Sequence, residues 1–266
     1  MEWLTGIHWG YWILFAAGVY FVGVPLLILP TFRIEANPTL QIVNPAELPL
    51  PGIVQQHLDA VETDLQQSGF AAVETVLLPC PLPNASAVLR VYVNRATQEA
   101  AMANSVFGMA GGHVNRHVQY VEFTTRYVDG HVFNTLNSSE PGSFPIPSHV
   151  LTVRIPWMTD VRRLHKIHQA ITAAKGPAGP KQLRLDATFD GDVLAFIQAC
   201  MREEMEHARS VGYLQLTASA SHYRATLLGA YLMTWRQLPP IKQLLMRRDR
   251  RRVEALLREF GVPDGR

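Results

Sequence analysis

A run of 20 residues without a charged side chain constrains this chain more than any other feature. The run is GYWILFAAGVYFVGVPLLIL, from Gly10 to Leu29. A helix of that length covers about 30 Å, the hydrocarbon thickness of a bilayer. Its prolines, Pro25 and Pro30, predict a kink near the far end and a stop soon after. The sequence therefore predicts a transmembrane anchor over residues 1–33. The side chains expected to hold it in the bilayer include Trp12, Phe15, Phe21 and Leu26.

Two other kinds of segment share this composition. A buried core helix is rarely this long and this free of charge. A cleaved signal peptide carries basic residues before its apolar stretch and a small-residue cleavage site after it. The first twelve residues contain no Lys or Arg, and no such cleavage site follows. The membrane anchor is therefore the favoured interpretation.

The few charges around the anchor predict its orientation. Glu2 is the only charged side chain before the apolar run, whereas Arg33 and most other basic residues follow it. Basic residues favour the cytoplasmic side of a membrane, so the soluble part is expected in the cytoplasm. The two cysteines, Cys80 and Cys200, form no disulfide or metal-binding pattern, which agrees with that compartment. The expected localisation is the cell membrane, with a single span.

A proline-rich segment, residues 34–52, follows the anchor and is predicted to be a semi-extended connector. The globular domain is expected over residues 53–236. Its first part reads mostly as strands, over 71–78, 87–93 and 149–155. The Asp129–Gly130 pair, flanked by β-forming residues, predicts a hairpin. The stretch TQEAAMANSVFGM, residues 97–109, is instead expected to be a short helix that ends in a glycine-rich turn.

Helical patterns frame these strands. An apolar stripe predicts a helix after residue 53, and further helices are expected over 160–174 and 192–210. Two more helical segments flank Pro239–Pro240. Strands early and helices late indicate an α+β fold: an antiparallel sheet covered by helices on one face, behind a single N-terminal transmembrane helix.

The C-terminal segment, residues 237–266, is predicted to be a basic amphipathic helix. Between Arg236 and Phe260 there are eight basic residues and three acidic ones, although the net charge of the whole chain is only +2. Such a helix can lie on anionic lipid headgroups, or it can pack on its own domain. Nucleic acid is a less favoured partner, because the tail lacks aromatic residues for base stacking. The candidate membrane or anion contacts are Arg236, Lys242, Arg247, Arg248, Arg250, Arg251 and Arg252.

The remaining candidates for chemistry are histidines and a glutamate on two predicted helices. His165 and His168 are three residues apart, close enough to share a metal ion. Glu204 and His207 have the Glu-x-x-His spacing of di-metal carboxylate bundles. However, His168 falls within the apolar stripe of its helix, which favours a buried core histidine. His113 and His117 lie in a predicted strand, about 13 Å apart, and are expected at the surface.

No phosphate-binding loop, nucleophile elbow or zinc-helix motif is present, and no cofactor is expected. The favoured function is a non-catalytic binding or scaffolding domain at the inner membrane surface. Its expected partners are the bilayer, anionic headgroups and another membrane protein. The first alternative is a metal-dependent hydrolase that uses the His/Glu cluster. The second is binding of nucleic acid or another polyanion through the basic tail.

Overall fold

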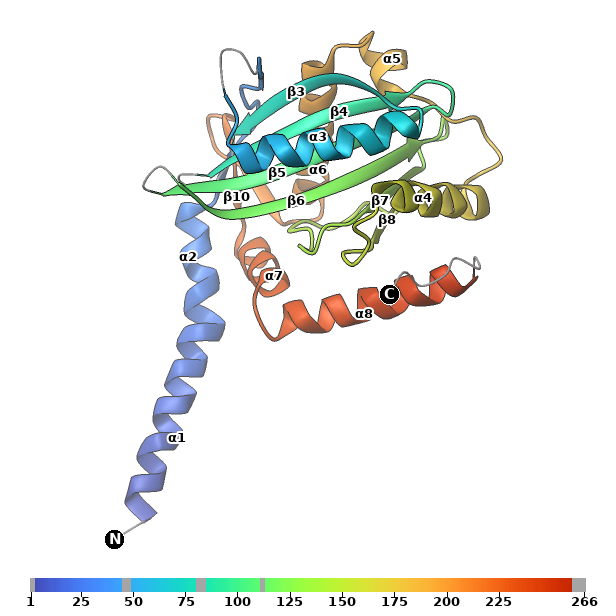
Figure 1. Ribbon diagram of the computed structural model, residues 1–266. Coiled ribbons are helices and arrows are strands. Elements are labelled where there is room, and N and C mark those ends of the chain that lie inside the picture. The colour runs from blue at the N-terminus through green and yellow to red at the C-terminus, as the bar shows by residue number, and fades with distance from the viewer. Residues whose placement is uncertain (1–2, 45–48, 80–84, 111–112, 260–266) are drawn as a thin grey trace.

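The computed structural model describes residues 3–44, 49–79, 85–110 and 113–259. Side chains are described from residue 9 onward, except at 79, 85, 109–110 and 113–117. A long N-terminal helix projects from a domain in which helices pack against a large, mixed β-sheet (Figure 1). The fold is therefore α+β, as the sequence predicts.

The N-terminal helix consists of α1 (Trp3–Gly18), a π-helical segment η1 (Val19–Gly23) and α2 (Val24–Thr31). The π-helical segment comes directly before Pro25, whose ring would clash with a carbonyl of the preceding turn in a regular α-helix. Between Trp9 and Thr31 the helix is long and apolar enough to cross a membrane, by length and composition. Its side chains are mostly exposed, so it is not a buried core helix; Trp9, for example, is 72% exposed.

The large sheet has the strand order β2-β3-β4-β5-β6-β7-β8. The predicted strands over 71–78 and 87–93 are confirmed, and they pair as antiparallel neighbours. The predicted hairpin is also confirmed: β6 pairs with β7 around a turn in which Gly130 has a φ of 94°. The strands are β2 (Gln41–Ile42), β3 (Ala71–Pro79), β4 (Ala85–Asn94), β5 (Glu99–Ala110), β6 (His113–Arg126), β7 (Val132–Leu136) and β8 (Val150–Arg154).

The last pair of strands shows that an antiparallel sheet is wrong as a description of the whole. β8 runs parallel to β7, with Val132 opposite Val150 and Leu136 opposite Arg154. A two-residue turn can only reverse the chain, whereas a parallel neighbour requires a longer connection. Residues 137–149 supply that connection, and their prolines keep them out of the sheet.

The helix predicted over residues 97–109 is also wrong, because that segment is the central strand β5, paired along most of its length with both β4 and β6. Its alanines have high helical propensity, but tertiary pairing overrides such a local preference. In the sheet, Ala101 and Ala103 face one core while Ala100 faces the other. Small side chains at these positions let helices approach both faces closely.

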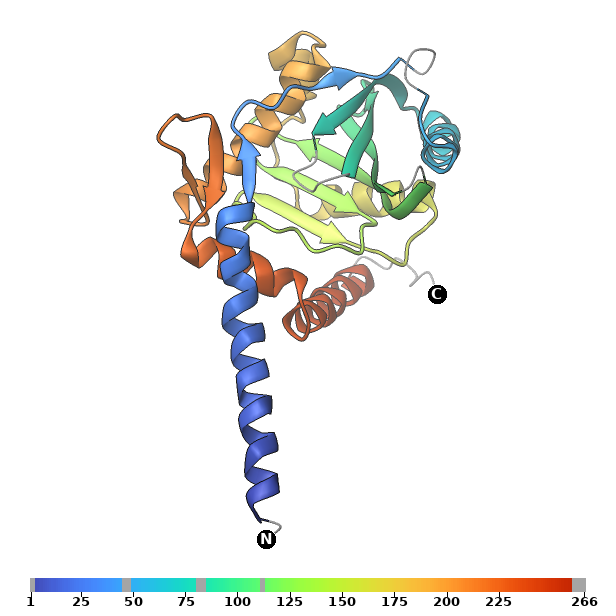
Figure 2. The same ribbon diagram turned by 90° about the vertical axis from the view of Figure 1, so that its left-hand side faces the viewer.

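Helices cover both faces of the large sheet, so the expectation of helices on one face is wrong (Figures 1 and 2). The reason is visible in β4, where Val88 and Tyr92 enter one core and Leu89 enters the other. A strand that is apolar on both sides needs cover on both sides. The first face carries α3 (Gly52–Gln67), α4 (Val161–Lys175) and α8 (Ile241–Glu259), and the second carries α5 (Arg184–Phe189) and α6 (Val193–Ser210).

The predicted late helices are confirmed. α4 begins after Asp160, whose carboxylate accepts a hydrogen bond from the Arg163 amide at 3.0 Å. α6 begins in the same way after Asp192, which accepts from the Ala195 amide. Such caps satisfy amides that the first helical turn leaves unpaired. α7 (Leu227–Gln237) and α8 lie on either side of Pro239–Pro240, as expected.

A second, three-stranded sheet joins the N-terminal helix to the C-terminal part of the chain. It consists of β1 (Arg33–Glu35), β10 (His222–Ala225) and β9 (Leu214–Leu216), in that order. Ile28, Leu29 and Phe32 pack against the small core formed by these strands, α6 and α7. The predicted connector, residues 34–52, thus contains β2 and all of β1 except Arg33, and each of these strands pairs with a strand of the domain.

Candidate functional site

The four candidate metal ligands lie on opposite faces of the large sheet. His165 and His168 belong to α4 on the first face, and Glu204 and His207 belong to α6 on the second. Among the residues that the structure describes, no group of three or more His, Cys, Asp or Glu side chains is placed to hold a metal ion. The fold therefore does not bring these four residues together.

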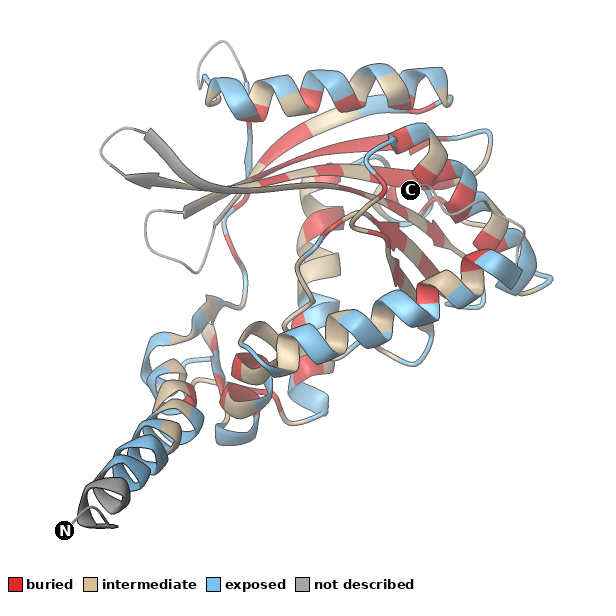
Figure 3. Cartoon of the chain, turned by 60° about the horizontal axis from the view of Figure 1, so that its bottom comes forward, coloured by how far each residue is buried: buried red, intermediate tan, exposed pale blue. Residues whose placement is uncertain are grey.

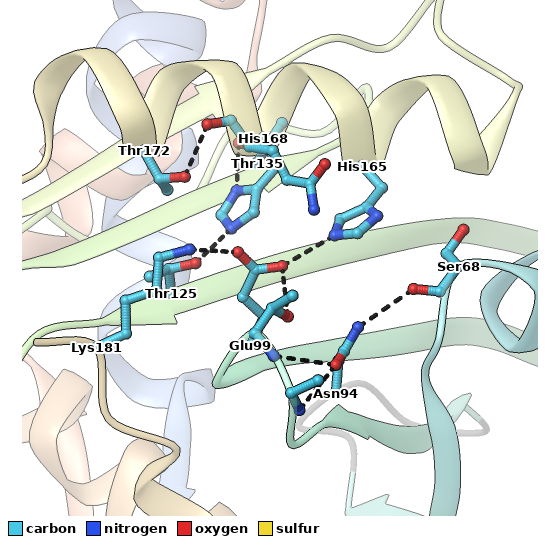
Figure 4. Close-up of polar contacts among 12 residues, drawn as sticks. Ser68, Asn94, Glu99, Thr125, Thr135, His165, His168, Thr172 and Lys181 are labelled. Atoms are coloured by element: carbon cyan, nitrogen blue, oxygen red, sulfur yellow. Dashed lines mark hydrogen bonds and ion pairs between the residues drawn. The ribbon is translucent and has the colours of Figure 1, made fainter.

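The two α4 histidines instead join a polar network inside the first core, at the ends of β5 and β6 (Figure 4). His165 Nε2 lies 2.9 Å from a carboxylate oxygen of Glu99, and Lys181 Nζ lies 2.6 Å from the other oxygen. The two ring nitrogens of His168 contact the hydroxyls of Thr125 and Thr135, at 2.8 and 2.9 Å. Each imidazole thus has a fixed partner on the sheet.

Burial and pairing set the charges in this network. Burial alone would raise the pKa of Glu99, but the hydrogen bonds from His165 and Lys181 outweigh it and hold that pKa at about 2. Burial lowers the pKa of the fully buried His168 to about 3, against an opposing effect of Glu99. His168 is therefore neutral at physiological pH, so one of its nitrogens donates to a threonine and the other accepts.

This network is a structural element of the core. Phe123 stacks against both imidazoles, with ring centroids 4.9 Å from His165 and 5.9 Å from His168. The helical stripe places His168 in the core, in agreement with the sequence analysis. Glu99 and Lys181 were missed, because a carboxylate at a strand start and a lysine 82 positions later show no shared pattern in the sequence.

A second group of titratable side chains lies on the other face, between β6 and α6. Burial raises the pKa of Glu122 to about 7; Arg154 opposes that shift and Glu204 adds to it. Burial also raises the pKa of Cys200 to about 11, so its thiol is unreactive at neutral pH. Glu204 thus lies close enough to Glu122 and Arg154 to affect their charges. Among the described residues, this group does not contain three side chains placed to hold a metal ion.

The seven basic candidates divide into two sets. Arg236 donates to the Phe144 carbonyl at 2.9 Å, Lys242 pairs with Glu140 at 2.8 Å, and Arg250 pairs with Glu254 at 2.8 Å. These three basic residues are therefore engaged in contacts within the protein. The other four are exposed and make no hydrogen bond or ion pair with any residue in the described part of the chain; they are Arg247, Arg248, Arg251 and Arg252, here called the arginine stripe.

The arginine stripe lies on one side of α8 because its members recur at i, i+1, i+4 and i+5. On the opposite side of the helix, Val253 and Leu257 are buried in the first core. The apolar side of α8 thus packs on its own domain, as one of the two expectations for the tail had it. What α8 presents outward is charge, with Leu244 beside it, 59% exposed.

The position of α8 relates the arginine stripe to the N-terminal helix. In Figures 1 and 2, α8 runs beneath the domain, across the direction in which α1 projects. Figure 3 shows this side of the molecule, where the outward residues of α8 are exposed. The stripe therefore faces the side from which the apolar helix leaves the domain.

α7 packs against the N-terminal helix, along the part of it that lies nearest the domain. The Trp235 ring stacks on Phe21, with centroids 4.7 Å apart, and the Tyr20 hydroxyl donates to the Pro239 carbonyl at 2.7 Å. Leu227 and Leu228, at the start of α7, remain more than half exposed. These contacts join the N-terminal helix to α7 and to the turn that follows it.

Comparisons of the chain with protein-family models, with curated proteins and with solved structures give no match.

Proposed function

We propose that this protein is a single-span membrane protein whose domain acts as a non-catalytic binding or scaffolding module on the inner membrane surface. The observation that carries the proposal is that α8 buries Val253 and Leu257 in the domain. Its opposite side, which carries the arginine stripe, therefore faces the side where the apolar helix projects (Figure 1). Each basic residue held near an anionic surface contributes about 1 kcal/mol of attraction. The four arginines of the stripe, which have no partner among the described residues, give this side of the domain a clear electrostatic preference.

The arginines also determine how deep the helix can lie. If the bilayer were centred on the segment Trp9–Thr31, α7 and the arginine stripe would enter the hydrocarbon, where each charge is costly. Below the contact of Tyr20 with Pro239, the helix extends from Trp3 to Tyr20. These 18 residues cover about 27 Å, close to the thickness of the hydrocarbon core of a bilayer. We therefore propose that α7 and α8 lie at the headgroup level. In that position Trp12 and Phe15 remain in the hydrocarbon, whereas Phe21 and Leu26, which the sequence analysis expects to hold the anchor in the bilayer, lie at or beyond its edge.

Aromatic and apolar side chains support this depth. Tyr20 and Trp235 lie at the level of α7, where amphipathic rings favour the membrane interface. The exposed Leu227, Leu228 and Leu244 would insert among the headgroups beside the stripe. A basic surface on the domain side also agrees with the expected cytoplasmic orientation. No specific observation favours the metal-dependent hydrolase.

The test compares the full-length protein in nanodiscs of neutral lipid and of neutral lipid mixed with phosphatidylserine. Anionic lipid should stabilise the folded domain against urea, because it binds that state preferentially. Replacing Arg247, Arg248 and Arg251 with glutamine should remove up to about 3 kcal/mol of this stabilisation. High salt should weaken the effect in the unmodified protein.

The matched control removes the same charge elsewhere, through the substitution of Arg95, Arg162 and Lys166 with glutamine. Arg162 bonds to Gln67 of α3, and Arg95 pairs with Asp186 of α5, so both point away from the arginine stripe. The control should keep the full difference between the two kinds of nanodisc. If anionic lipid leaves the stability of the unmodified protein unchanged, the stripe is not a membrane contact, and a polyanionic partner becomes the better explanation.

A further inference from the structure

The outer side of α2, which points away from the domain, carries exposed leucines. On its inner side, Ile28 and Leu29 pack against the small core formed with α6, α7, β9 and β10. Leu27 points the opposite way and is 67% exposed, and Leu26 beside it is 42% exposed. In the proposed position of the domain, this part of α2 lies beyond the hydrocarbon, so lipid tails do not cover it. Neighbouring exposed apolar side chains of this kind mark a contact with another molecule.

The three-stranded sheet continues this outer side with two arginines. β1 follows α2 and packs Ile34 against the same small core, so the preceding residue, Arg33, points outward. On β10, Tyr223 is buried in that core, and Arg224 points outward. Both arginines are exposed, and neither makes a hydrogen bond or an ion pair with a residue that the structure describes.

The strand register places these two arginines directly opposite each other. The Ala36 amide donates to the Ser221 carbonyl at 2.9 Å, three positions along the ladder, so Arg33 and Arg224 form a non-hydrogen-bonded pair. Side chains approach most closely in such pairs, because the Cα atoms are only about 4.5 Å apart. Like charges at this spacing repel each other, and an anion between them would turn that repulsion into attraction.

The other polar residues of this face leave both arginines available. Glu35 lies on the same face, opposite His222, but it makes no ion pair with either arginine in the described structure. Gln215 of β9 is exposed and lies opposite Arg224. The three residues Arg33, Arg224 and Gln215, here called the arginine row, thus offer positive charge and hydrogen-bond donors to an anionic group.

The height of the arginine row excludes lipid headgroups as its partner. Tyr20 marks the proposed edge of the hydrocarbon, and the chain rises by about 20 Å from there to Arg33. The headgroup layer is only about 5 to 8 Å thick on each side of a bilayer. The arginine row therefore lies in water beyond the lipid, where the apolar outer side of α2 ends.

A second copy of the chain does not fit this surface either. Copies anchored in one bilayer share an orientation, so a two-fold axis between them runs along the membrane normal and brings equal heights together. Arg33 and Arg224 would then meet the same arginines of the other copy, and Glu35 would meet Glu35. Complementary charge requires a different partner, with acidic side chains at this height.

We propose that the outer side of α2 and the arginine row together dock a helix of a second, different membrane protein. That helix leaves the bilayer beside α2, packs apolar side chains on Leu26 and Leu27, and places an aspartate or glutamate between Arg33 and Arg224. The acidic residue follows the transmembrane stretch of the helix by about 13 residues, which span about 20 Å. The inference names a partner class for the proposed scaffolding function and rests on it, because the depth of the anchor sets these heights.

The experiment places the full-length protein in phosphatidylcholine liposomes with a synthetic single-span peptide. The peptide has a polyleucine span, continues as a helix with leucines on one side, and carries two glutamates about 20 Å beyond the span. Energy transfer measures association, with the donor dye on an azide-bearing residue at Ser219, an exposed position in the turn between β9 and β10. The glutamate peptide should associate at least tenfold more strongly than the same peptide with lysines.

Substitutions in the arginine row test its role in this preference. Arg33→Gln with Arg224→Gln should weaken association of the glutamate peptide at least tenfold. The control, Arg95→Gln with Arg162→Gln, removes the same charge elsewhere on the domain and should leave association within twofold. Because both row arginines are exposed, their charge can also be reversed: Arg33→Glu with Arg224→Glu should transfer the preference to the lysine peptide.

A second pair of substitutions tests the apolar part of the surface. Leu27→Gln should weaken association of the glutamate peptide severalfold, because it removes the apolar contact on α2. Val128→Gln is the matched control, since Val128 is 60% exposed and lies next to the hairpin turn, away from α2. It should leave association within twofold.

Equal association of the glutamate and lysine peptides, or no association of either, would overturn the docking surface. The nanodisc stability test separates this failure from that of the proposed function, because it depends on anionic lipid and the arginine stripe, whereas the peptide experiment uses neutral lipid and the arginine row. If the response to anionic lipid persists without a preference for the glutamate peptide, only the docking surface is wrong. If both are absent, the position of the domain on the membrane is wrong as well.

Discussion

His168 offers a quantitative test of the buried network, because its neutral state in the folded protein depends on pH. Its pKa is about 3 in the folded chain and 6.5 in the ordinary, solvated state. Between these values the unfolded chain binds a proton that the folded chain does not, so lowering the pH favours unfolding. From pH 7 to pH 4.5 this linkage removes about 2.5 kcal/mol from the free energy of unfolding.

Other groups titrate over the same range, so the comparison must be made against a variant. Glu122, whose pKa is raised to about 7, stabilises the folded state as the pH falls. Glu99 contributes only about 0.4 kcal/mol of loss down to pH 4.5, because its depressed pKa acts mainly below its ordinary value of 4.5. Substituting His168 removes its own contribution and leaves that of Glu122 in place. It changes that of Glu99 only slightly, because His168 is the smallest of the causes that lower the pKa of Glu99.

The variant is His168→Gln, which retains an amide for one threonine. At pH 7 it should be about 2 to 3 kcal/mol less stable than the unmodified protein, since it leaves a buried hydroxyl unpaired. At pH 4.5 that gap should shrink by about 2.5 kcal/mol, so that the two proteins nearly converge. Urea unfolding of the full-length protein in detergent measures both gaps.

His131→Gln is the control, because His131 is exposed and pairs with Asp129 in the hairpin turn. Its gap to the unmodified protein should stay within about 0.5 kcal/mol at both pH values. If the His168→Gln gap is the same at pH 7 and pH 4.5, then His168 is not held neutral by burial, and the description of the network is wrong.

Three further substitutions or reactions test other parts of the fold. Gly229→Ala should destabilise the domain by about 1 to 3 kcal/mol, because the added Cβ would clash with the Tyr213 carbonyl, whereas Gly52→Ala meets open space and should change the melting temperature little. A double-mutant cycle of Trp235→Ala and Phe21→Ala should give a coupling of about 0.5 to 1.5 kcal/mol, and no coupling would place the two rings apart. Cys200 should react with iodoacetamide at pH 8 about a hundredfold more slowly than a cysteine in a peptide, as followed by mass spectrometry; an equal rate would show an open thiol.

Local signals in the sequence predict much of this fold. Asp160 and Asp192 mark two helix starts, and Asp129–Gly130 marks a hairpin, because each acts through its own neighbours in the chain. The central strand β5 carries no such signal. Its alanines favour a helix in isolation, and only the pairing with β4 and β6 makes them a strand.

The candidate sites also combine features that the sequence predicts with features that only tertiary contacts determine. The position of His168 within an apolar stripe predicts its burial, but its partners Thr125 and Thr135 come from strands that only the folded sheet brings together. The basic composition of the tail is evident in the sequence. Which arginines face outward depends on where Val253 and Leu257 find the core, and that contact is tertiary.

The depth of the N-terminal helix in the bilayer tests the membrane-facing surface most directly. Nitroxide labels at Ile13, Leu27 and Arg251, all exposed positions, can be compared in full-length protein in nanodiscs through their accessibility to oxygen and to a nickel chelate. We expect Ile13 near the bilayer centre, and Leu27 and Arg251 together at or above the headgroups. Equal depths for Ile13 and Leu27, with Arg251 far out in water, would contradict the proposal that α8 lies on the membrane.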